Sequence, residues 1–275
     1  MKHIAILAAT FALSAIFAQS ASAAEELTPS QLALMQSADV VLLGEVHDNP
    51  DHHRNQSELT AMLQPSAMVW EMLTEEGAKR IGRQALSEPE KLAIALKWAE
   101  LGWPPLSMYL PVFRAAPDAP VFGALVPRAA ARAAMETGSA VAFGADAARF
   151  GLTIPLPAEE QAARERNQQE AHCNALPEEL PHKLVAIQRL RDAVLTRAIL
   201  TALEDTGGPV VVITGNGHAR KDWGVPSFLS RMTPGVRVFS LGQSEDGSIH
   251  GDFDAVIDSP AAERPDPCLA FEKKS

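Results

Sequence analysis

The residues whose types and spacing best suit chemistry lie in two short GxxH segments, GEVH at residues 44–47 and GNGH at residues 215–218. Each segment directly follows an apolar run, so an imidazole stands where a strand is expected to end. Carboxylates are added by Glu45 within the first segment and by Glu71 at the end of another apolar run. In open α/β sheets, ligands bind at the carboxyl ends of the strands.

If the strands carrying these segments are neighbours, four side chains ring one pocket: Glu45, His47, Glu71 and His218. Imidazole and carboxylate ligands suit a divalent transition metal. A carboxylate that tunes the pKa of a histidine equally suits general acid–base catalysis. The plainer alternatives are a capping and solvated turn for Glu45 and His47, and a loop histidine with a backbone hydrogen bond for His218.

A long helix expected over residues 181–204 carries Arg191 and Asp192 among apolar positions. The two are either a solvated pair, worth about 0–1 kcal/mol, or a second layer behind the pocket. Phosphate-loop, dinucleotide-binding and GxSxG signatures do not occur, which argues against nucleotide-dependent and serine-hydrolase chemistry.

Apolar runs that alternate with helical patterns predict an α/β fold, with a mostly parallel central sheet flanked by helices. Asn49 is expected to cap the first site helix, with Pro50 at its first position. The helices expected between about residues 74 and 116 form a cap or insertion. The expected strands cover residues 40–43, 67–72, 120–125, 210–214, 236–241 and 253–257.

The first 23 residues have the pattern of a secretory signal peptide, with a basic start, an apolar stretch over 4–17 and Ala-Ser-Ala at 21–23. A membrane anchor is the weaker alternative, because the apolar stretch is short. No cysteine lies near the cleavage point, so we expect a periplasmic or secreted protein without a lipid anchor. The formal charge of −10 argues against a nucleic-acid partner.

The two cysteines, Cys173 and Cys268, lie far apart and form no CxxC pair. In an oxidising compartment they most simply form one disulfide, which would tie the C-terminal tail (about 259–275) to the helices. In the chain-entropy model such a loop adds roughly 3–5 kcal/mol. Two free buried thiols are the alternative.

The sequence resembles the ChaN-like family of exported haem-binding uptake proteins, in the Tiki/TraB-related superfamily. The resemblance covers nearly all of the mature chain, as one domain over residues 24–275. It rests on GEVHDNPDHHRNQ (44–56), VWEM (69–72), WPPLSMYLPVF (103–113), QRLRDA (188–193), VVVITGNGHARKDWGVP (210–226) and RPDPC (264–268). The sequence departs from the family pattern at two places. Several relatives have a lipid-bearing cysteine that this sequence lacks, and residues 125–128 are Leu-Val-Pro-Arg where the family often has Asn-Leu-Pro-Arg.

The resemblance implies haem as the cofactor, with a tyrosinate as iron ligand, haem-dependent homodimers and contact with outer-membrane haem-uptake machinery. Tyr109 is the only tyrosine of the chain, and a phenolate is a known axial ligand of haem. His52, His53, Arg54 or the helix N-terminus after Asn49 would receive the haem propionates. Relatives in the wider superfamily that use such a rim catalytically imply the alternative, a peptide or ester hydrolase with or without a divalent metal.

Overall fold

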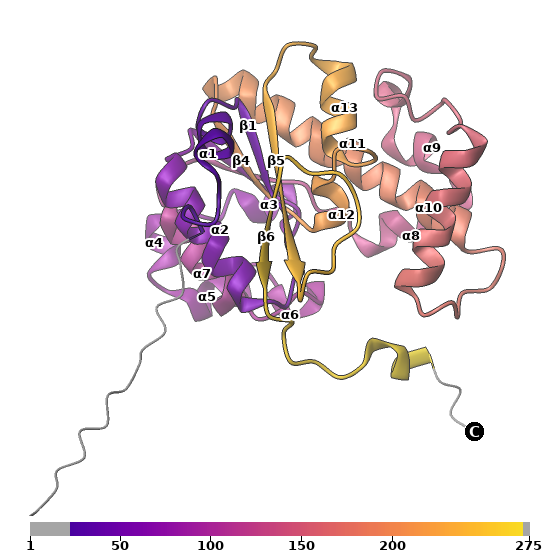
Figure 1. Cartoon of the computed structure of the whole chain (residues 1–275), viewed down its shortest axis with the longest axis horizontal. Coiled ribbons are helices and arrows are strands. Elements are labelled where there is room, and N and C mark those ends of the chain that lie inside the picture. Colours follow the sequence, from indigo (N-terminus) through magenta and orange to yellow (C-terminus); the bar gives the residue numbers. More distant parts are fainter. Residues whose placement is uncertain (1–22, 272–275) are drawn as a thin grey trace, which may run out of the picture.

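The computed structural model describes residues 23–271, and the expected signal peptide lies almost entirely outside them. One sheet of six parallel strands, in the order β3-β2-β4-β1-β5-β6, forms the centre of the molecule (Figure 1). Helices cover both faces of the sheet, which confirms the expected α/β class. The strands are β1 (Val40–Leu43), β2 (Ala67–Trp70), β3 (Val121–Gly123), β4 (Val210–Ile213), β5 (Val238–Glu245) and β6 (Ala255–Ser259).

The two faces of the sheet belong to two different hydrophobic clusters. Val41 and Leu43 of β1 lie in one cluster, while Val40 and Leu42 lie in the other. Successive side chains of a strand point to opposite faces, so a strand packed on both sides must be apolar at every position. This explains why β1 (VVLL), β2 (AMVW) and β4 (VVVI) are continuous apolar runs, buried throughout.

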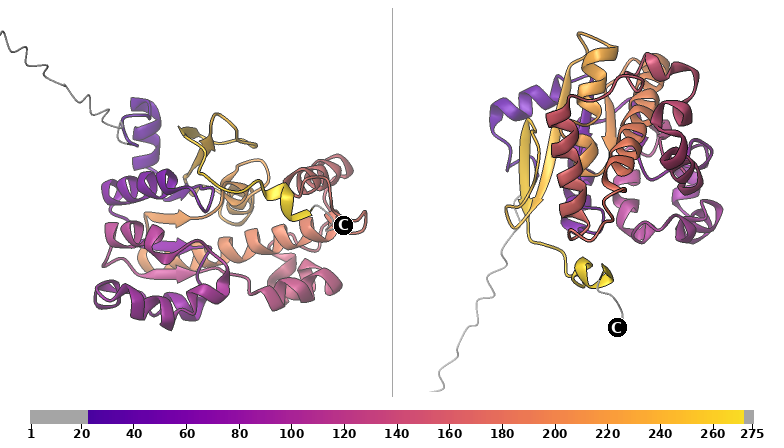
Figure 2. Two further views of the ribbon diagram at one scale, coloured as in Figure 1. Left: turned by 90° about the horizontal axis from the view of Figure 1, so that it is seen from below. Right: turned by 90° about the vertical axis from the view of Figure 1, so that its right-hand side faces the viewer.

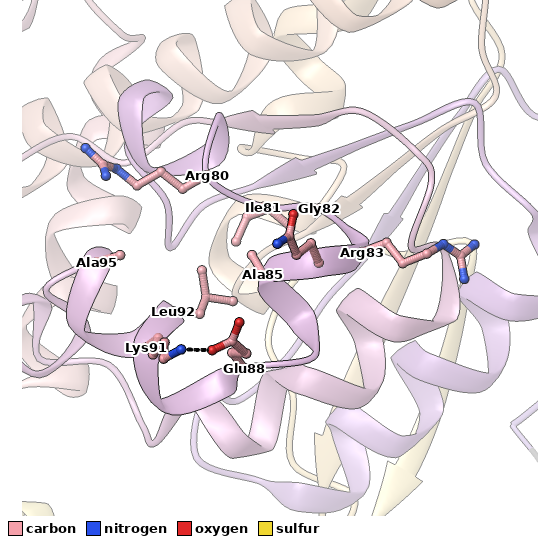
Figure 3. A pocket seen from close by; sticks show the side chains of 10 residues that line it. Arg80, Ile81, Gly82, Arg83, Ala85, Glu88, Lys91, Leu92 and Ala95 are labelled. Carbon is pink, nitrogen blue, oxygen red and sulfur yellow. Dashed lines mark ion pairs between the residues drawn. The ribbon is translucent and has the colours of Figure 1, made fainter.

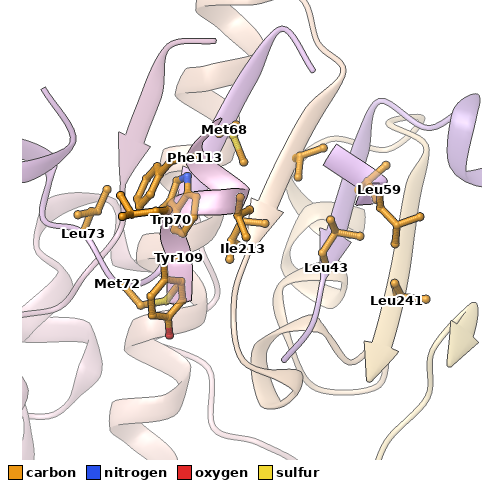
Figure 4. Packing of buried hydrophobic residues seen from close by; sticks show 14 of the residues in the cluster. Leu43, Leu59, Met68, Trp70, Met72, Leu73, Tyr109, Phe113, Ile213 and Leu241 are labelled. Atoms are coloured by element: carbon orange, nitrogen blue, oxygen red, sulfur yellow. The ribbon is translucent and has the colours of Figure 1, made fainter. Parts of the chain in front are cut away.

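The first cluster packs the sheet against α2 and α7. Its largest buried side chains include Trp70, Tyr109 and Phe113, and the rings of Trp70 and Phe113 stack with centroids 3.8 Å apart (Figure 4). Tyr109 and Phe113 are four residues apart on one helix and therefore share its buried face. Residues 107–116, which were expected as an apolar aromatic segment at the end of the helical insertion, lie almost entirely in α7, which contains Pro111.

The opposite face is covered by α11, the longest helix, which runs along the sheet (Figure 2). The helices are α1 (Pro29–Gln36), α2 (Pro50–Leu63), α3 (Glu75–Ala78), α4 (Arg83–Leu86), α5 (Pro89–Ala95), α6 (Trp98–Leu101), α7 (Leu106–Ala115), α8 (Arg128–Thr137), α9 (Ser139–Phe143), α10 (Ala158–Ala171), α11 (Pro181–Thr206), α12 (Asn216–Ala219) and α13 (Val225–Met232), with 3-10 turns η1 (Ala145–Ala148) and η2 (Pro267–Phe271). No helix of the described chain is long and apolar enough to span a bilayer.

Helix α2 begins as its sequence predicts. The side chain of Asn49 accepts hydrogen bonds from the amides of Asp51 and His52, and Pro50 occupies the first turn. Five short helices, α3 to α7, occupy the stretch between β2 and β3 where a helical insertion was expected. The last two strands begin two residues later than expected. For β5 the reason is that the amide of Val236 is used in a turn to Thr233.

The C-terminal tail leaves β6 and passes to the helical layer, where Cys268 forms a disulfide with Cys173 (Figure 1). Arg264 holds the tail to the body through ion pairs with Asp48 and Glu245. The expected disulfide is therefore present, and it joins residues 95 positions apart.

Reduction of this disulfide is expected to lower the free energy of unfolding by about 2–4 kcal/mol, the usual range for a long closed loop. The measurement is urea denaturation of the wild type with and without dithiothreitol. The double variant Cys173→Ser/Cys268→Ser should unfold at the midpoint of the reduced wild type in both buffers. An unchanged midpoint on reduction would contradict a stabilising role for the cross-link.

Candidate functional site

The two GxxH segments lie side by side at the carboxyl ends of neighbouring strands. β1 pairs with β4, and β4 pairs with β2, so the segments after these three strands meet at one edge of the sheet. His47 Nε2 lies 4.0 Å and His218 Nε2 lies 3.5 Å from the same carboxylate oxygen, Oε1 of Glu71. The strands that carry the GxxH segments are therefore neighbours, which is the condition for the four predicted side chains to share one site.

Both GxxH glycines are needed for close approach. A Cβ atom on Gly44 would lie 2.4 Å from Asn216 Oδ1, and one on Gly215 would lie 3.1 Å from His47 Nε2. A Cβ atom at Gly44 would overlap Asn216, because real Cβ atoms do not approach another atom this closely. A Cβ atom at Gly215 would force the His47 ring to move by a few tenths of an ångström. The absence of a side chain at Gly215 therefore leaves room for the His47 ring beside the end of β4.

Glu45 is the buried acceptor beneath the rim. Its Oε1 accepts from His47 Nδ1 at 2.6 Å and from the Tyr109 hydroxyl at 3.1 Å, and its Oε2 accepts from Gln56 Nε2 at 2.8 Å. Burial lowers the pKa of His47, but the hydrogen bond to Glu45 and the charge of Glu71 outweigh it, so the pKa stands above its ordinary value. With Nδ1 engaged, Nε2 of His47 makes no hydrogen bond within residues 23–271.

His218 is held between two carboxylates. Its Nδ1 donates to Asp192 Oδ1 at 2.6 Å, and its Nε2 faces Glu71. Burial would lower its pKa, but the charges of Glu71 and Asp192 raise the pKa of His218 to about 10. Glu71 is fixed in turn by the Thr214 hydroxyl and the Gly215 amide, each 2.8 Å from Oε2. Burial raises the pKa of Glu71, but the charge of His218 and its hydrogen bond outweigh burial, so the pKa lies below the usual range. His218 is thus a buried imidazolium at neutral pH.

Stability is expected to fall as the pH rises from 7 to 9.5. The pKa of His218 is about 10 in the folded protein and near 6.5 in the unfolded chain. The contribution of His218 to the free energy of unfolding is therefore complete below pH 6.5 and disappears as the pH approaches 10. One proton gives a slope of at most about 1.4 kcal/mol per pH unit. Urea denaturation across this range should show a steeper loss for wild type than for His218→Gln, and parallel losses would contradict the prediction.

A cavity of about 640 Å³ opens above this rim, within the range of small-molecule sites. Its lining combines apolar side chains with charged ones. The ring of His47, with 32% of its side chain exposed, lies against Trp103 with ring centroids 4.8 Å apart. The lining residues are His47, Glu71, Thr74, Glu100, Leu101, Gly102, Trp103, Leu125, Val126, Pro127, Arg128, Gln188, Arg191, Gly215, Gly217 and His218.

Two cations of this cavity have no counter-ion among residues 23–271. Arg128 donates to the backbone oxygen of Leu101 at 3.2 Å, and neither Arg128 nor Arg191 forms an ion pair there. Unpaired guanidinium groups beside an apolar wall suit a ligand with carboxylates and a flat apolar body.

The predicted propionate ligands lie elsewhere. His52 is buried, accepts the Val46 amide at Nδ1 and bonds the Ser244 carbonyl at Nε2, and burial lowers its pKa. His53 is buried and bonds the His47 carbonyl at 2.8 Å. Arg54 forms an ion pair with Asp51 on the surface. None of the three lines the cavity, because α2 turns these side chains into the support beneath the rim or out to solvent.

Tyr109 lies directly under the rim but does not line the cavity. Its side chain has no exposed surface, and its hydroxyl donates to Glu45 with the His47 carbonyl 3.4 Å away. Its ring makes edge contacts with Trp70, Trp98 and His53. Burial and the neighbouring Glu45 carboxylate raise the pKa of Tyr109 far above its usual value. The side chain is therefore a neutral donor in this arrangement.

The expected pair Arg191 and Asp192 is divided between two positions: Arg191 lines the cavity, and Asp192 supports His218 from behind. Sequence reasoning missed Gln188 and Arg128. Gln188 precedes Asp192 by one helical turn, and Arg128 follows the end of β3, so the spacing used for the other site residues would have found both.

Within residues 23–271 no group of three or more His, Cys, Asp or Glu side chains is arranged to hold a metal ion, so the divalent-metal alternative finds no support.

A separate groove of about 540 Å³ lies between α4 and α5, with Arg80, Glu88 and Lys91 on its walls (Figure 3). Its charged pair, Glu88 with Lys91, is exposed. This groove contains no buried titratable group.

Comparisons with known proteins agree with this fold. A solved structure described as cofacial haem binding to ChaN of Campylobacter jejuni matches with a TM-score of 0.58 and 22% identity, covering 82% of this chain and 89% of that one. A succinoglycan biosynthesis protein matches with a TM-score of 0.44 and 12% identity, covering 79% of this chain and 68% of that one. The type III effector HopBA1 matches with a TM-score of 0.40 and 13% identity, covering 83% of this chain and 90% of that one. No curated protein gives a significant match.

The family model described as "Haem-binding uptake, Tiki superfamily, ChaN" matches residues 31–229, which include all three strand ends of the site. The match extends over more than half of the sequence and confirms the resemblance seen in its motifs. This chain belongs to the ChaN family of haem-binding uptake proteins in the Tiki superfamily.

Proposed function

We propose that the protein binds haem in the cavity at the carboxyl ends of β1, β2 and β4, and that it takes part in haem or iron uptake. The observation that carries the proposal is the composition of this cavity, which combines apolar side chains such as Trp103 with two arginines that form no ion pair and with the partly exposed imidazole of His47. Haem presents a flat apolar ring, two carboxylates and an iron that accepts imidazole ligands. Membership of a haem-binding uptake family supports the same conclusion.

The proposal includes export and assembly. The signal-like pattern of the first 23 residues and the disulfide support a periplasmic or secreted protein without a lipid anchor. A haem seated in an open cavity leaves apolar surface uncovered, and a second copy of the chain would bury it. Delivery to outer-membrane haem-uptake machinery would then be the cellular role.

Titration of the purified mature protein with haemin tests haem binding. A saturable change of the Soret band with defined stoichiometry is expected, together with a rise in sedimentation coefficient if a haem-bound dimer forms. The control is the double variant Arg128→Gln/Arg191→Gln, which removes both unpaired cations and should weaken binding about 10-fold or more. A Soret band identical to that of free haemin would contradict the proposal.

A tyrosinate ligand at Tyr109, which the family resemblance implies, would require a rearrangement of the buried layer beneath the rim. A phenolate at Tyr109 would have to lose its proton beside the Glu45 carboxylate, in a site without exposed surface. The imidazoles of His52 and His53 are likewise engaged with backbone groups. The residues that fit haem are those of the cavity.

A second candidate function is acid–base hydrolysis of an ester or peptide. The observation that favours it is the Glu45–His47 hydrogen bond of 2.6 Å, which leaves one imidazole nitrogen of an oriented histidine unused beside a cavity. A screen of ester and peptide substrates with wild type and His47→Ala, before and after metal analysis, tests it. Equal background rates in the two proteins would remove this candidate.

A further inference from the structure

We propose that a second cavity, formed by residues 150–157 together with α10, α11 and α13, binds a small organic anion whose carboxylate or phosphate group is attached to an apolar body. The cavity has a volume of about 400 Å³, within the range of small-molecule sites. It shares no lining residue with the cavity at the carboxyl ends of β1, β2 and β4. The inference therefore concerns a separate site and goes beyond the proposed function.

The first argument concerns the charges of this second cavity. Its two acidic lining residues, Glu160 and Asp222, each already form an ion pair with a neighbouring arginine. Two further arginines of the lining, Arg189 and Arg231, form no ion pair within residues 23–271. Two positive charges of the cavity are therefore left without an acidic partner in the described chain.

The second argument concerns where these two guanidinium groups lie, because they meet at Gly151. Nη2 of Arg189 donates to the carbonyl oxygens of Gly151 and Ile154, at 2.9 and 3.0 Å. Arg231 lies against the same glycine, since a Cβ atom on Gly151 would overlap Nη1 of Arg231. Gly151 has a φ of +71°, which favours glycine. The side chain of Arg231 makes no hydrogen bond with the described residues, so its donors are available to a ligand.

The third argument concerns the cost of gathering these cations. Burial lowers the pKa of Arg189 below its ordinary value, and the charges of Arg164 and Arg231 lower it further, while Glu160 opposes them. An arginine keeps its proton in proteins, so the repulsion between these groups persists at neutral pH. A bound oxyanion would offset this repulsion, and a guanidinium group can hold a carboxylate or a phosphate through two parallel N–H groups.

The fourth argument concerns the apolar part of the lining, which comes from residues 150–157 and from α13. Phe150 and Phe228 are buried, Leu156 is half-buried, and Ile154 is 56% exposed beside them. An inorganic anion between the arginines would leave this apolar surface in contact with water. An apolar group attached to the anion would cover it, and burial of apolar surface is favourable. The lining therefore matches an anion with an apolar body.

The test is isothermal titration calorimetry of the purified mature protein with four small probes. Phenylacetate and phenyl phosphate combine an oxyanion with an apolar ring, whereas phenylacetamide lacks the charge and acetate lacks the ring. The first two should bind at one site with a dissociation constant in the low millimolar range or tighter, as usual for ligands of this size. Phenylacetamide and acetate should bind at least about 10-fold more weakly, because each lacks one of the two recognised parts.

Arg231→Gln is the variant that locates the binding, since this exposed side chain makes no hydrogen bond whose loss could unfold the protein. It should weaken phenylacetate binding about 10-fold, the usual effect of losing a hydrogen bond to a charged group. Arg166→Gln is the matched control, because Arg166 is an exposed arginine of α10 outside the cavity and the change in charge is the same. This control should bind phenylacetate as wild type does.

A second variant, Arg189→Gln, should weaken phenylacetate binding at least as much as Arg231→Gln does. Because Arg189 also holds two backbone carbonyls, urea denaturation of this variant distinguishes lost binding from lost folding. Binding of only one of the two ring-bearing anions would support the proposal and identify the preferred oxyanion.

Three results would overturn the proposal. The first is no saturable binding of either ring-bearing anion to wild type. The second is equal affinity of wild type and Arg231→Gln, above all if Arg128→Gln/Arg191→Gln is weakened instead, which would place the anion in the other cavity. The third is equal affinity for acetate and phenylacetate, which would show that the apolar lining takes no part in binding.

Discussion

Replacing Asp192 with alanine is expected to lower the free energy of unfolding at pH 7 by about 3–5 kcal/mol, the usual cost of removing one partner of a buried ion pair. Asp192 is 1% exposed and accepts the Nδ1 proton of His218 at 2.6 Å. Without it, Glu71, 3.5 Å from the other ring nitrogen, is the one carboxylate left beside the buried imidazolium among the described residues. Urea denaturation at pH 7 measures the loss.

Asp192→Asn is the matched variant, because it removes the charge but keeps the size of the side chain and one oxygen acceptor for His218 Nδ1. Asp192→Asn should lower the free energy of unfolding less than Asp192→Ala does. In Asp192→Asn the pKa of His218, followed by NMR titration, should fall below the wild-type value of about 10. A wild-type pKa in Asp192→Asn would show that this carboxylate does not hold the proton on His218.

Replacing Glu45 with alanine is expected to have a comparable effect, about 2–6 kcal/mol. The hydroxyl of Tyr109 and the amide of Gln56 would both lose their acceptor in the buried layer beneath the rim. Each buried donor left without a partner costs about 1–3 kcal/mol. His47 would also lose the hydrogen bond that orients its ring, so haemin affinity should fall in the same variant.

A double-mutant cycle isolates this network. Tyr109→Phe removes one of the donors that Glu45→Ala leaves unpaired, so the double variant should be more stable than the sum of the single losses predicts, with a coupling of about 0.5–3 kcal/mol. Losses that simply add would show that Tyr109 and Glu45 do not interact in solution.

The strand ends of the site could be read from the sequence because strong local patterns mark them. VVLL and VVVI are apolar at every position, which only a strand buried on both faces requires. A glycine and a histidine after each run then place the imidazoles. The cap of α2 followed equally directly from Asn49-Pro50, because an Asn side chain and a Pro ring are both favoured at a helix start.

The allocation of donors within the site could not be read in this way, because it depends on tertiary packing. His52, His53 and Tyr109 are residue types that bind haem elsewhere, but α2 and α7 pack against each other and turn all three into the layer below the rim. Sequence spacing shows that His53 and Gln56 share a helix face, and it does not show whether that face meets a ligand or a buried carboxylate. Arg128 follows the end of β3 and could have been found by its position, whereas its lack of a counter-ion is visible only in three dimensions.

The most direct test of the account is the position of the iron in crystals of the haem-loaded protein, located by its anomalous scattering. The account predicts a single iron peak inside the cavity bounded by His47, Trp103, Arg128 and Arg191. An iron peak at the Tyr109 hydroxyl, or one outside this cavity, would contradict it.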